Sequence, residues 1–553
     1  MIRLQGKGVS GGVAAGPLYF YRRGNGEIER REVADTAAEL ARFEEARKTA
    51  MEQLGALYEK ALAEVGEESA QLFESHQLML DDLDYVESVQ GMVEGGLNAE
   101  AAVADTAEIF AEMFANMDDA YMQARAADVR DISGRVVGIL TGAVAGGIDS
   151  DVPVVLASDD LAPSETVQLD KSKILGFVTR GGSGNSHTAI LARTMGIPAI
   201  CSVGDALEDG FEGREVIIDG QTGEIVFDAD AAARDRLLKK QAKERALKEL
   251  LEKLKGQPNV TIDGRSVMVY CNIGSPEDVD AVLQNDGGGI GLFRSEFLYL
   301  QNNDYPTEEQ QFQAYKTVAE RMGGKRVIIR TLDIGADKQA DYFQLDHEEN
   351  PAMGLRAIRI CLTRPEVFRT QLRALYRASA YGKIAIMFPM ITSVWEVQEI
   401  KRICANVREE LMREGVPMAD YVELGIMIET PASVMLSDRL AKEVDFFSVG
   451  TNDLTQYTLA VDRQGQSLDR FFDAHHPAVL RMLKMAADNA HAAGIWIGIC
   501  GELGADVSLT ETFLAIGIDE LSVSPSSVLP LRSTVRSIDS SARRDEILAE
   551  LAK

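Results

Sequence analysis

The stretch VDFFSVG at residues 444–450 is one of eight short apolar runs that recur through the C-terminal half of the chain. The others lie at 268–272, 289–294, 326–332, 384–390, 424–429, 495–500 and 519–523, and a helical pattern follows each run. Apolar runs of this length are typical of strands that are buried on both faces. Eight such strands alternating with helices predict a (β/α)8 TIM barrel over residues 259–553.

The sequence before the barrel shows two other residue patterns, one helical and one mixed. Residues 21–145 hold few Gly or Pro and space their apolar residues three and four apart, which predicts an inserted all-helical domain. Residues 1–20 and 146–228 read as short strands between glycine turns and predict one α/β domain made from two segments. The charged, alanine-rich stretch 229–258 predicts a linker helix. The expected fold class is therefore multidomain α/β.

The composition excludes several classes of protein. The 553 residues include 57 Lys and Arg against 87 Asp and Glu, a net charge of −30, which repels nucleic acid and steers basic protein partners. No apolar stretch has the length of a membrane span, and the N-terminus lacks a secretory pattern. The five cysteines are scattered without metal or disulfide spacing. We expect a cytoplasmic protein with reduced thiols, no nucleic-acid partner and no membrane insertion.

Charged and polar side chains gather where the predicted strands end, and a TIM barrel carries its chemistry there. They are Arg294, Arg330, Glu429, Asn452, Asp453 and Cys500, with Arg356 and Arg463 in the segments after the third and sixth strands. Several arginines at one mouth indicate a small polyanionic ligand, because guanidinium groups match carboxylate and phosphate oxygens. Surface ion pairs are the alternative, and they explain single residues better than the whole set.

Two carboxylates and one thiol among these residues indicate further chemistry. Glu429 and Asp453 suit a hard divalent ion that keeps waters and binds substrate phosphate. A cysteine at a strand end is more often a small buried hydrophobe than a catalyst. The position of Cys500 beside the mouth, followed by Gly501 and Glu502, nevertheless favours a role in proton transfer.

A second candidate site lies in GGSGNSHTAILARTMGIPAI at residues 181–200, which holds His187. Small residues precede the histidine and a helical pattern follows it, so His187 is expected near a helix N-terminus, where backbone N–H groups favour phosphate. An imidazole can act as a nucleophile and carry a phosphoryl group. A lone loop histidine is more often incidental. Any reaction of His187 with a ligand at the barrel mouth requires domain movement.

Together these segments resemble Enzyme I of the bacterial phosphotransferase system, a family of phosphoenolpyruvate-utilising phosphotransferases. The resemblance covers essentially the whole chain. Its most specific pieces are SHTAILAR, GIGLFRSEFLYL, RTLDIGADK, NPAMGLRAIR, MFPMIT, IMIETPAS, VGTNDLTQYTLAVDR and ICGELGAD.

The resemblance implies that phosphoenolpyruvate phosphorylates His187 with release of pyruvate, and that the phosphoryl group then passes to the phosphocarrier protein HPr in the first step of sugar uptake. It assigns Mg²⁺ to Glu429 and Asp453, proton donation to Cys500, and support of the phosphohistidine to Thr166. It places phosphoenolpyruvate on Arg294, Arg330, Arg356, Asn452, Asp453 and Arg463. It also implies HPr contacts at Glu67, Glu68 and His76 in the helical domain, and a homodimer formed through the barrel domain.

One motif departs from the family, and two rival functions remain. The family's Gly-Gly-Arg-Thr-Ser-His run reads Gly182-Ser183-Gly184-Asn185-Ser186-His187 here, which alters how a phosphohistidine is held. ATP-using relatives such as phosphoenolpyruvate synthase need a large nucleotide-binding domain before the histidine, and the segment here is helical and has no P-loop pattern. A non-catalytic paralogue that only binds the carrier is disfavoured by the intact His187, Cys500 and carboxylates.

Overall fold

The computed structural model describes residues 1–21, 28–64, 67–116, 120–142, 148, 150–182, 186–300, 302, 304–335, 340–462 and 470–553; for a few of these, including Glu67, Glu68 and His187, only the backbone is described. The chain divides into two compact units, Met1–Leu247 and Lys248–Lys553. The boundaries of the smaller domains predicted within them stay a prediction. Within the described ranges, no helix combines the length and the apolar composition needed to cross a membrane.

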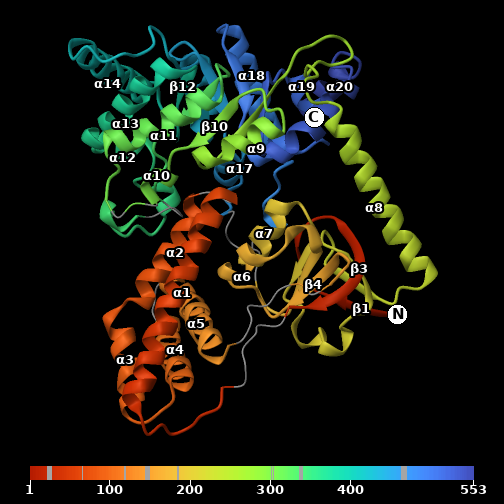
Figure 1. Cartoon of the computed structure of the whole chain (residues 1–553). Coiled ribbons are helices and arrows are strands. Elements are labelled where there is room, and N and C mark those ends of the chain that lie inside the picture. Colours follow the sequence, from red (N-terminus) through yellow and green to blue (C-terminus); the bar gives the residue numbers. More distant parts are fainter. Residues whose placement is uncertain are drawn as a thin grey trace. The chain divides into compact units, whose positions relative to one another are not determined.

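The first unit contains a helical bundle, drawn in red and orange in Figure 1. Its sequence is rich in Ala, Glu and Leu, which are strong helix formers. Asp82 caps the third helix by accepting hydrogen bonds from the backbone of Asp84 and Tyr85. The helices pack around a core that includes Phe43, Phe73 and Val103. They are α1 (Thr36–Glu64), α2 (Glu67–Leu80), α3 (Leu83–Glu94), α4 (Ala99–Ala115) and α5 (Ala120–Thr141).

The first unit also contains a mixed sheet in the order β1-β8-β7-β3-β4-β5-β6-β2. The N-terminal strands pair with strands from beyond residue 150, so two distant segments build one sheet. The strands are β1 (Ile2–Gln5), β2 (Lys7–Ser10), β3 (Val13–Phe20), β4 (Val154–Ser158), β5 (Ile174–Thr179), β6 (Ala199–Cys201), β7 (Glu215–Asp219) and β8 (Glu224–Phe227). Helices α6 (Pro163–Gln168) and α7 (His187–Met195) contact each other, and the largely exposed α8 (Ala231–Glu252) occupies the predicted linker.

The second unit is a closed barrel of eight parallel strands, which confirms the predicted fold class. Strands such as β12 are buried along their whole length because helices cover the outside and side chains fill the inside. All eight predicted strands are present: β9 (Met268–Ile273), β10 (Ile290–Arg294), β11 (Val327–Arg330), β12 (Ile384–Phe388), β13 (Glu423–Ile428), β14 (Phe446–Val449), β15 (Trp496–Ile499) and β16 (Glu520–Val523).

Helices connect the barrel strands and form its outer layer, drawn in green to blue in Figure 1. Thr307 caps α11, which is typical of the polar starts of these helices. They are α9 (Val279–Gln284), α10 (Phe297–Leu300), α11 (Glu308–Arg321), α12 (Ile358–Thr363), α13 (Pro365–Ala378), α14 (Val394–Arg413), α15 (Pro431–Met435), α16 (Ser437–Leu440), α17 (Thr451–Leu459), α18 (Pro477–Ala492), α19 (Thr510–Ile516), α20 (Val528–Ser537) and α21 (Arg544–Ala552).

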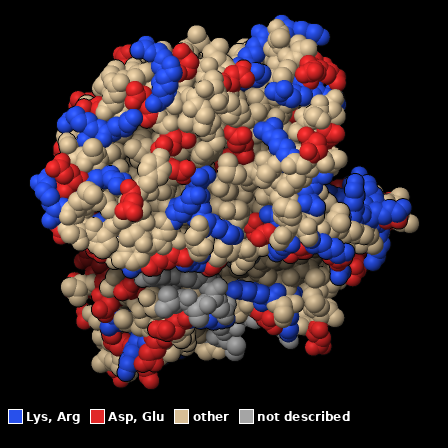
Figure 2. Space-filling model, turned by 90° about the horizontal axis from the view of Figure 1, so that it is seen from above, with Lys and Arg blue, Asp and Glu red and all other residues tan. Residues whose placement is uncertain are grey.

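The surface charge is mixed on the face drawn in Figure 2. Basic and acidic side chains are interspersed there, so the net charge of −30 is not gathered into one acidic patch on that face. This face therefore offers no single acidic surface that would steer a basic partner.

Candidate active site

Arg330, the last residue of β11, is buried between two buried carboxylates. Its Nη1 lies 3.0 Å from Oδ2 of Asp333, and its Nη2 contacts Oε1 of Glu296. Glu296 follows the end of β10, and Asp333 follows the end of β11. Two neighbouring strand ends therefore hold one guanidinium in a fixed orientation, as a buried ion pair requires.

Arg356 extends this cluster from the long segment after β11. Its Nη2 donates to Oδ1 of Asp333 at 2.9 Å and to Oδ2 of Asp453 at 3.4 Å. Its Nη1 donates to the hydroxyl of Tyr457 at 3.2 Å. Asp333 therefore contacts both arginines, and Arg356 links it to the start of α17. The structure brings together residues that are more than 100 positions apart in sequence.

The charges of this cluster support one another. Burial by itself lowers the pKa of Arg330, but Glu296 and Asp333 raise it, and the net shift is upward. Burial opposes the charge of Arg356 in the same way, and Asp333 and Asp453 again raise the pKa above its ordinary value. Both guanidinium groups therefore stay charged at the barrel mouth, where they can bind an anion.

Glu429 lies directly after β13 and is fully buried. The backbone N–H of Met390 donates to its Oε1 at 2.5 Å, and Met390 adopts a left-handed φ of 57°, which is uncommon for a non-glycine residue. Gly450 closes in from the next strand end: a Cβ there would lie 2.7 Å from Oε2 of Glu429. The carboxylate is therefore held by backbone atoms on two sides.

Glu429 and Asp453 are the two carboxylates for which the sequence predicted a metal. Burial is the main reason that the pKa of Glu429 lies above its ordinary value, and the charge of Asp453 raises it further. A divalent cation would relieve this repulsion. Within the described ranges, no three His, Cys, Asp or Glu side chains form a ready-made cage. Two carboxylates suit an ion that keeps waters and takes its other ligands from a substrate. Asn452, which is half-buried, precedes Asp453 on α17.

Arg294 ends β10 with an exposed side chain, unlike the two buried arginines. It lines a cavity of about 280 Å³ together with Asn272, Gly501 and Glu502. This cavity lies at the carboxyl ends of β9, β10 and β15, so Arg294 stands where a ligand would enter the barrel mouth. Arg463 lies outside the described residues.

Cys500 follows β15 and is 2% exposed. Its thiol donates to the carbonyl of Val449 at 3.6 Å. Burial raises the pKa of the thiol to about 12, while the facing hydroxyl of Ser448 acts to lower it. A Cβ on the next residue, Gly501, would lie 2.0 Å from Oγ1 of Thr451, so only glycine fits there. Cys500 is therefore a protonated thiol at neutral pH, as a proton donor must be.

His187 is the first residue of α7 in the other unit, and its side chain is not among those described. Ser186 caps the helix by accepting from the N–H of Ala189 at 3.4 Å. Thr188 donates to Oδ1 of Asp160 at 2.9 Å, which fixes the first turn. Thr166 is buried on the adjoining α6. His187 thus begins a capped helix of nine residues, as predicted, where free N–H groups favour a phosphate.

Three regions of the chain match models of known protein families. Residues 248–540 match the PEP-utilising enzyme, PEP-binding domain; residues 5–125 match the PEP-utilising enzyme, N-terminal; and residues 151–223 match the PEP-utilising enzyme, mobile domain. The chain is 42% identical over 537 residues to the phosphoenolpyruvate-protein phosphotransferase of Bacillus subtilis (strain 168), covering 97% of this chain and 94% of the relative. The chain belongs to the PEP-utilising enzyme family.

Two further relatives carry the same name. The phosphoenolpyruvate-protein phosphotransferases of Bacillus sp. (strain S) and Geobacillus stearothermophilus are each 42% identical to this chain over 552 residues. Each alignment covers 99% of this chain and 96% of the relative. The similarity of this PEP-utilising enzyme to its relatives therefore runs through both units.

Three residues were expected to contact a carrier protein, and the structure describes the side chain of only one of them. Glu67 and Glu68 begin α2, and their side chains lie outside the described residues. His76 is fully buried on α2: its Nε2 lies 3.3 Å from Oδ1 of Asp128, and its ring meets Phe73 edge-on at 5.9 Å. In this structure His76 packs α2 against the bundle and is not presented to a partner. Its role in carrier binding stays a prediction.

Sequence reasoning assigned no role to Glu296, Asp333 or Tyr457, although all three hold the arginines. Glu296 and Asp333 lie two and three residues after the strand-end arginines Arg294 and Arg330, so proximity in sequence was an available signal. No such signal marks Tyr457 in the sequence, because only the path of the chain after β11 brings Arg356 to it. A larger cavity of about 680 Å³, lined by residues such as Tyr305 and Arg364, contains none of the predicted site residues.

Proposed function

We propose that this chain is a phosphoenolpyruvate-protein phosphotransferase that phosphorylates His187 from phosphoenolpyruvate, releases pyruvate, and passes the phosphoryl group to HPr in the first step of sugar uptake. Its relatives at 42% identity over nearly the whole chain carry that name. The observation that carries the proposal is the buried cluster of Arg330 and Arg356 at the barrel mouth, because phosphoenolpyruvate has both a phosphate and a carboxylate for guanidinium groups to bind.

The chemistry is mostly positioning and charge neutralisation. Arg330 and Arg356 hold the anionic substrate in a fixed orientation, with Arg294 and Arg463 as further contacts and Asn452 as a hydrogen-bonding partner. The imidazole of His187 attacks phosphorus in line and takes the phosphoryl group. Cys500 then donates its proton to the enolate carbon, so the product leaves as pyruvate. Because His187 and Cys500 belong to different units, the transfer requires that the two units bring these residues together.

Magnesium is the proposed cofactor, held by Glu429 and Asp453. When bound, it supplies positive charge that neutralises the phosphoryl oxygens. The buried, mutually repelling carboxylates support this assignment, because two hard oxygen donors are what Mg²⁺ takes from a protein when substrate phosphate provides the rest. Thr166, which is buried on the helix next to α7, supports the phosphohistidine.

The proposal extends to partners and location. Glu67, Glu68 and His76 are the proposed HPr contacts, and for His76 this requires a rearrangement, because its side chain is buried. We also propose a homodimer formed through residues 259–553, which light scattering of the full chain would test. A cytoplasmic location is consistent with five cysteines that are all free and buried.

The test is incubation with ³²P-labelled phosphoenolpyruvate and MgCl₂, followed by mapping of the acid-labile phosphate. We expect label on His187 and none on the His187→Ala variant, which should fold normally because position 187 begins a helix and alanine is a strong helix former. Label on a different histidine of the variant would contradict the assignment. Label on His187 that HPr does not remove would contradict the second transfer.

A further inference from the structure

Glu520 lies inside the barrel on β16 and has no role in the proposed reaction. It is 0% exposed, and neither carboxyl oxygen has a hydrogen-bond partner among the described residues. By contrast, the partly exposed Glu423 of β13 is paired with Arg326 at 2.9 Å. A buried carboxylate without partners is costly, so such a group takes up a proton instead. Burial raises the pKa of Glu520 well above its ordinary value, although Arg326 opposes this. Glu520 is therefore a neutral acid.

Two glycines keep space for this side chain. A Cβ on Gly498 of β15 would lie 1.9 Å from Oε2 of Glu520, and a Cβ on Gly291 of β10 would lie 2.4 Å from Oε1. The same point beside Gly291 is 2.5 Å from the hydroxyl of Ser522. The carboxyl group thus occupies a slot that any other residue at either position would fill.

The slot opens toward Cys500. In the sheet register, Ser448 of β14 is paired with Gly498, and Gly498 is paired with Glu520, so no side chain stands between Ser448 and Glu520 on β15. Cys500 lies two residues beyond Gly498, and alternate residues of a strand point to the same face. The Ser448 hydroxyl lies close enough to the Cys500 thiol to lower its pKa, and no other partner of this hydroxyl is found among the described residues. The thiol, the hydroxyl and the carboxyl group therefore line one gap inside the barrel, although no hydrogen bond joins Ser448 to Glu520 among the described residues.

Apolar side chains surround this meeting point. Cys500 packs in a cluster with Leu292, Met427 and Phe446. A thiol that gives up its proton in such surroundings becomes a buried thiolate, which is poorly solvated. Bulk water reaches the sulfur only slowly, because Cys500 is 2% exposed, so solvent does not reprotonate the thiolate while the enolate is still bound. A second internal acid could reprotonate this buried thiolate.

We propose that Glu520 is the internal proton reservoir of Cys500 and that the Ser448 hydroxyl connects them. The inference rests on the proposed function. When the Cys500 S–H bond breaks and its proton goes to the enolate carbon, Ser448 gives its hydroxyl proton to the thiolate. A side-chain rotation across the space that Gly498 leaves then brings Ser448 to Glu520, and Ser448 takes a proton from the Glu520 carboxyl. The negative charge is then on Glu520, on the side of Arg326. After pyruvate leaves, solvent water returns a proton along the same path in reverse. Neither Glu520 nor Ser448 touches the substrate, so both are positioning residues for the proton.

The test is exchange of the pyruvate methyl protons with D₂O, followed by NMR on the full chain with pyruvate and MgCl₂. Exchange requires Cys500 to take a methyl proton and to replace it with deuterium from solvent before returning it. We expect Glu520→Gln, which keeps the size and neutrality of the acid, to slow exchange by about 10²-fold, within the range of general acid catalysis. Ser448→Ala should slow it similarly. The double variant should be no slower than the slower single variant, because the two groups act in series.

A matched control separates this role from packing. Glu396 is also a buried carboxylate of the barrel unit, but it caps α14 on the outside by accepting from the backbone of Thr392 and Ser393. Glu396→Gln should lower the melting temperature and leave exchange per folded molecule unchanged. A packing role for Glu520 predicts the same result for Glu520→Gln, so normal exchange in that variant overturns the relay.

The other outcomes are equally decisive. If Glu520→Gln does not fold, Ser448→Ala decides alone, and normal exchange in it overturns the relay. If the wild-type chain exchanges pyruvate and becomes labelled on His187 while both variants behave like it, only the relay is wrong. If the wild-type chain shows neither exchange nor phosphohistidine, the proposed function is wrong and the relay falls with it.

Discussion

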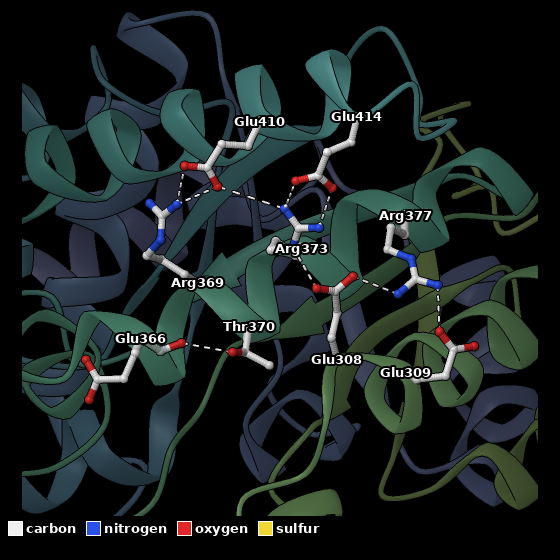
Figure 3. A network of polar contacts seen from close by, with 9 residues as sticks. All are labelled: Glu308, Glu309, Glu366, Arg369, Thr370, Arg373, Arg377, Glu410 and Glu414. Carbon is white, nitrogen blue, oxygen red and sulfur yellow. Dashed lines mark hydrogen bonds and ion pairs between the residues drawn. The ribbon is translucent and has the colours of Figure 1, made fainter.

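Arginines and carboxylates form two networks in the barrel unit, one at the mouth and one outside. The mouth cluster consists of Glu296, Arg330, Asp333, Arg356 and Asp453. The outer ladder, drawn in Figure 3, runs along α13 and joins it to α11 and α14. Its members are Arg369, Arg373 and Arg377 with Glu308, Glu309, Glu410 and Glu414.

The two networks differ in burial and in how completely their donors are used. In the outer ladder, Nε of Arg373 donates to Glu308 at 2.6 Å and its Nη2 donates to Glu414 at 2.6 Å, with the arginine side chain 22% exposed. In the mouth cluster, the side chains of Arg330 and Arg356 are 7% and 5% exposed, and the Nε of each is buried with no partner among the described residues.

That difference separates a brace, meaning an ion-pair network that only stabilises the fold, from a binding site. A brace saturates its hydrogen-bonding groups within the folded chain, whereas a binding site keeps buried donors in reserve for a ligand. Inside the barrel, the oxygens of Glu520 are likewise buried without a hydrogen-bond partner among the described residues, although Glu520 is proposed to exchange a proton and not to bind a ligand. A count of arginines or ion pairs alone would favour the outer ladder over the mouth cluster as the binding site.

The largest difference between the networks should come from removing one arginine from each. We expect Arg330→Met to slow pyruvate release by about 10³–10⁵-fold, the range for an arginine that neutralises phosphoryl charge. It should also lower the free energy of unfolding by about 3–5 kcal/mol, because Glu296 and Asp333 each lose a buried charge partner, although Asp333 keeps Arg356. Both tryptophans, Trp395 and Trp496, lie in the barrel unit, so tryptophan fluorescence in urea reports its unfolding. Pyruvate release within tenfold of wild type would make the mouth cluster a brace as well.

A smaller effect on turnover is expected from Cys500→Ser, which changes the acidity of a group beside the mouth cluster and not its charge. Pyruvate release should fall by about 10²–10⁴-fold because a hydroxyl is a much weaker acid than a thiol. Affinity for phosphoenolpyruvate should stay near that of wild type, since the arginines are intact. Isothermal titration, melting temperature and pyruvate release are to be measured on the one variant. A destabilised Cys500→Ser protein with normal turnover per folded molecule would show that the cysteine only packs.

Arg373→Met should affect stability alone. The expected loss in the free energy of unfolding is about 1 kcal/mol, because partly exposed ion pairs gain little over their hydrated forms. Pyruvate release should stay within twofold of wild type, because no part of the outer ladder reaches the strand ends. The same urea titration and the same kinetic assay apply as for Arg330→Met. A large loss of turnover here would mean that the two networks are coupled through α13.

Salt should have the smallest effect and should distinguish the two networks with the two variants already described. Raising NaCl from about 0.1 M to about 1 M shortens the screening length from roughly 10 Å to roughly 3 Å. The stability difference between wild type and Arg373→Met should shrink toward zero, because the outer ladder is partly solvated. The difference between wild type and Arg330→Met, the mouth variant already made for the first prediction, should persist. Equal salt sensitivity of both differences would contradict the distinction between a buried and a solvated network.

The barrel and the position of its mouth were predictable, because eight apolar runs set the strands and the strand ends must converge. That reasoning found Arg330, Glu429 and Cys500. It could not distinguish the two arginine networks. Arg369, Arg373 and Arg377 recur every four residues, as on any solvated helix face, and the partners of Arg369 and Arg373 at the end of α14 lie 41 positions away.

Other features depended on packing that the sequence does not display. Glu520 in DELSV reads as an ordinary acidic residue at a strand, and only the closed register shows that it points at Gly498 and Gly291. His76 was expected at a partner surface, but the bundle encloses it beside Asp128. Whether a polar residue of an amphipathic element is enclosed depends on neighbours that are distant in sequence.

Gly450 and Gly501 have a consequence for attempts to change what this protein accepts. One missing side chain leaves room for Glu429, and the other leaves room for Thr451. A library that randomises both positions should return glycine almost exclusively, even under selection for stability alone, because no rotamer of a larger residue avoids the clash. Substrate range would therefore have to be redesigned from Arg294 and the open cavity beside it, where the walls are side chains that can be exchanged.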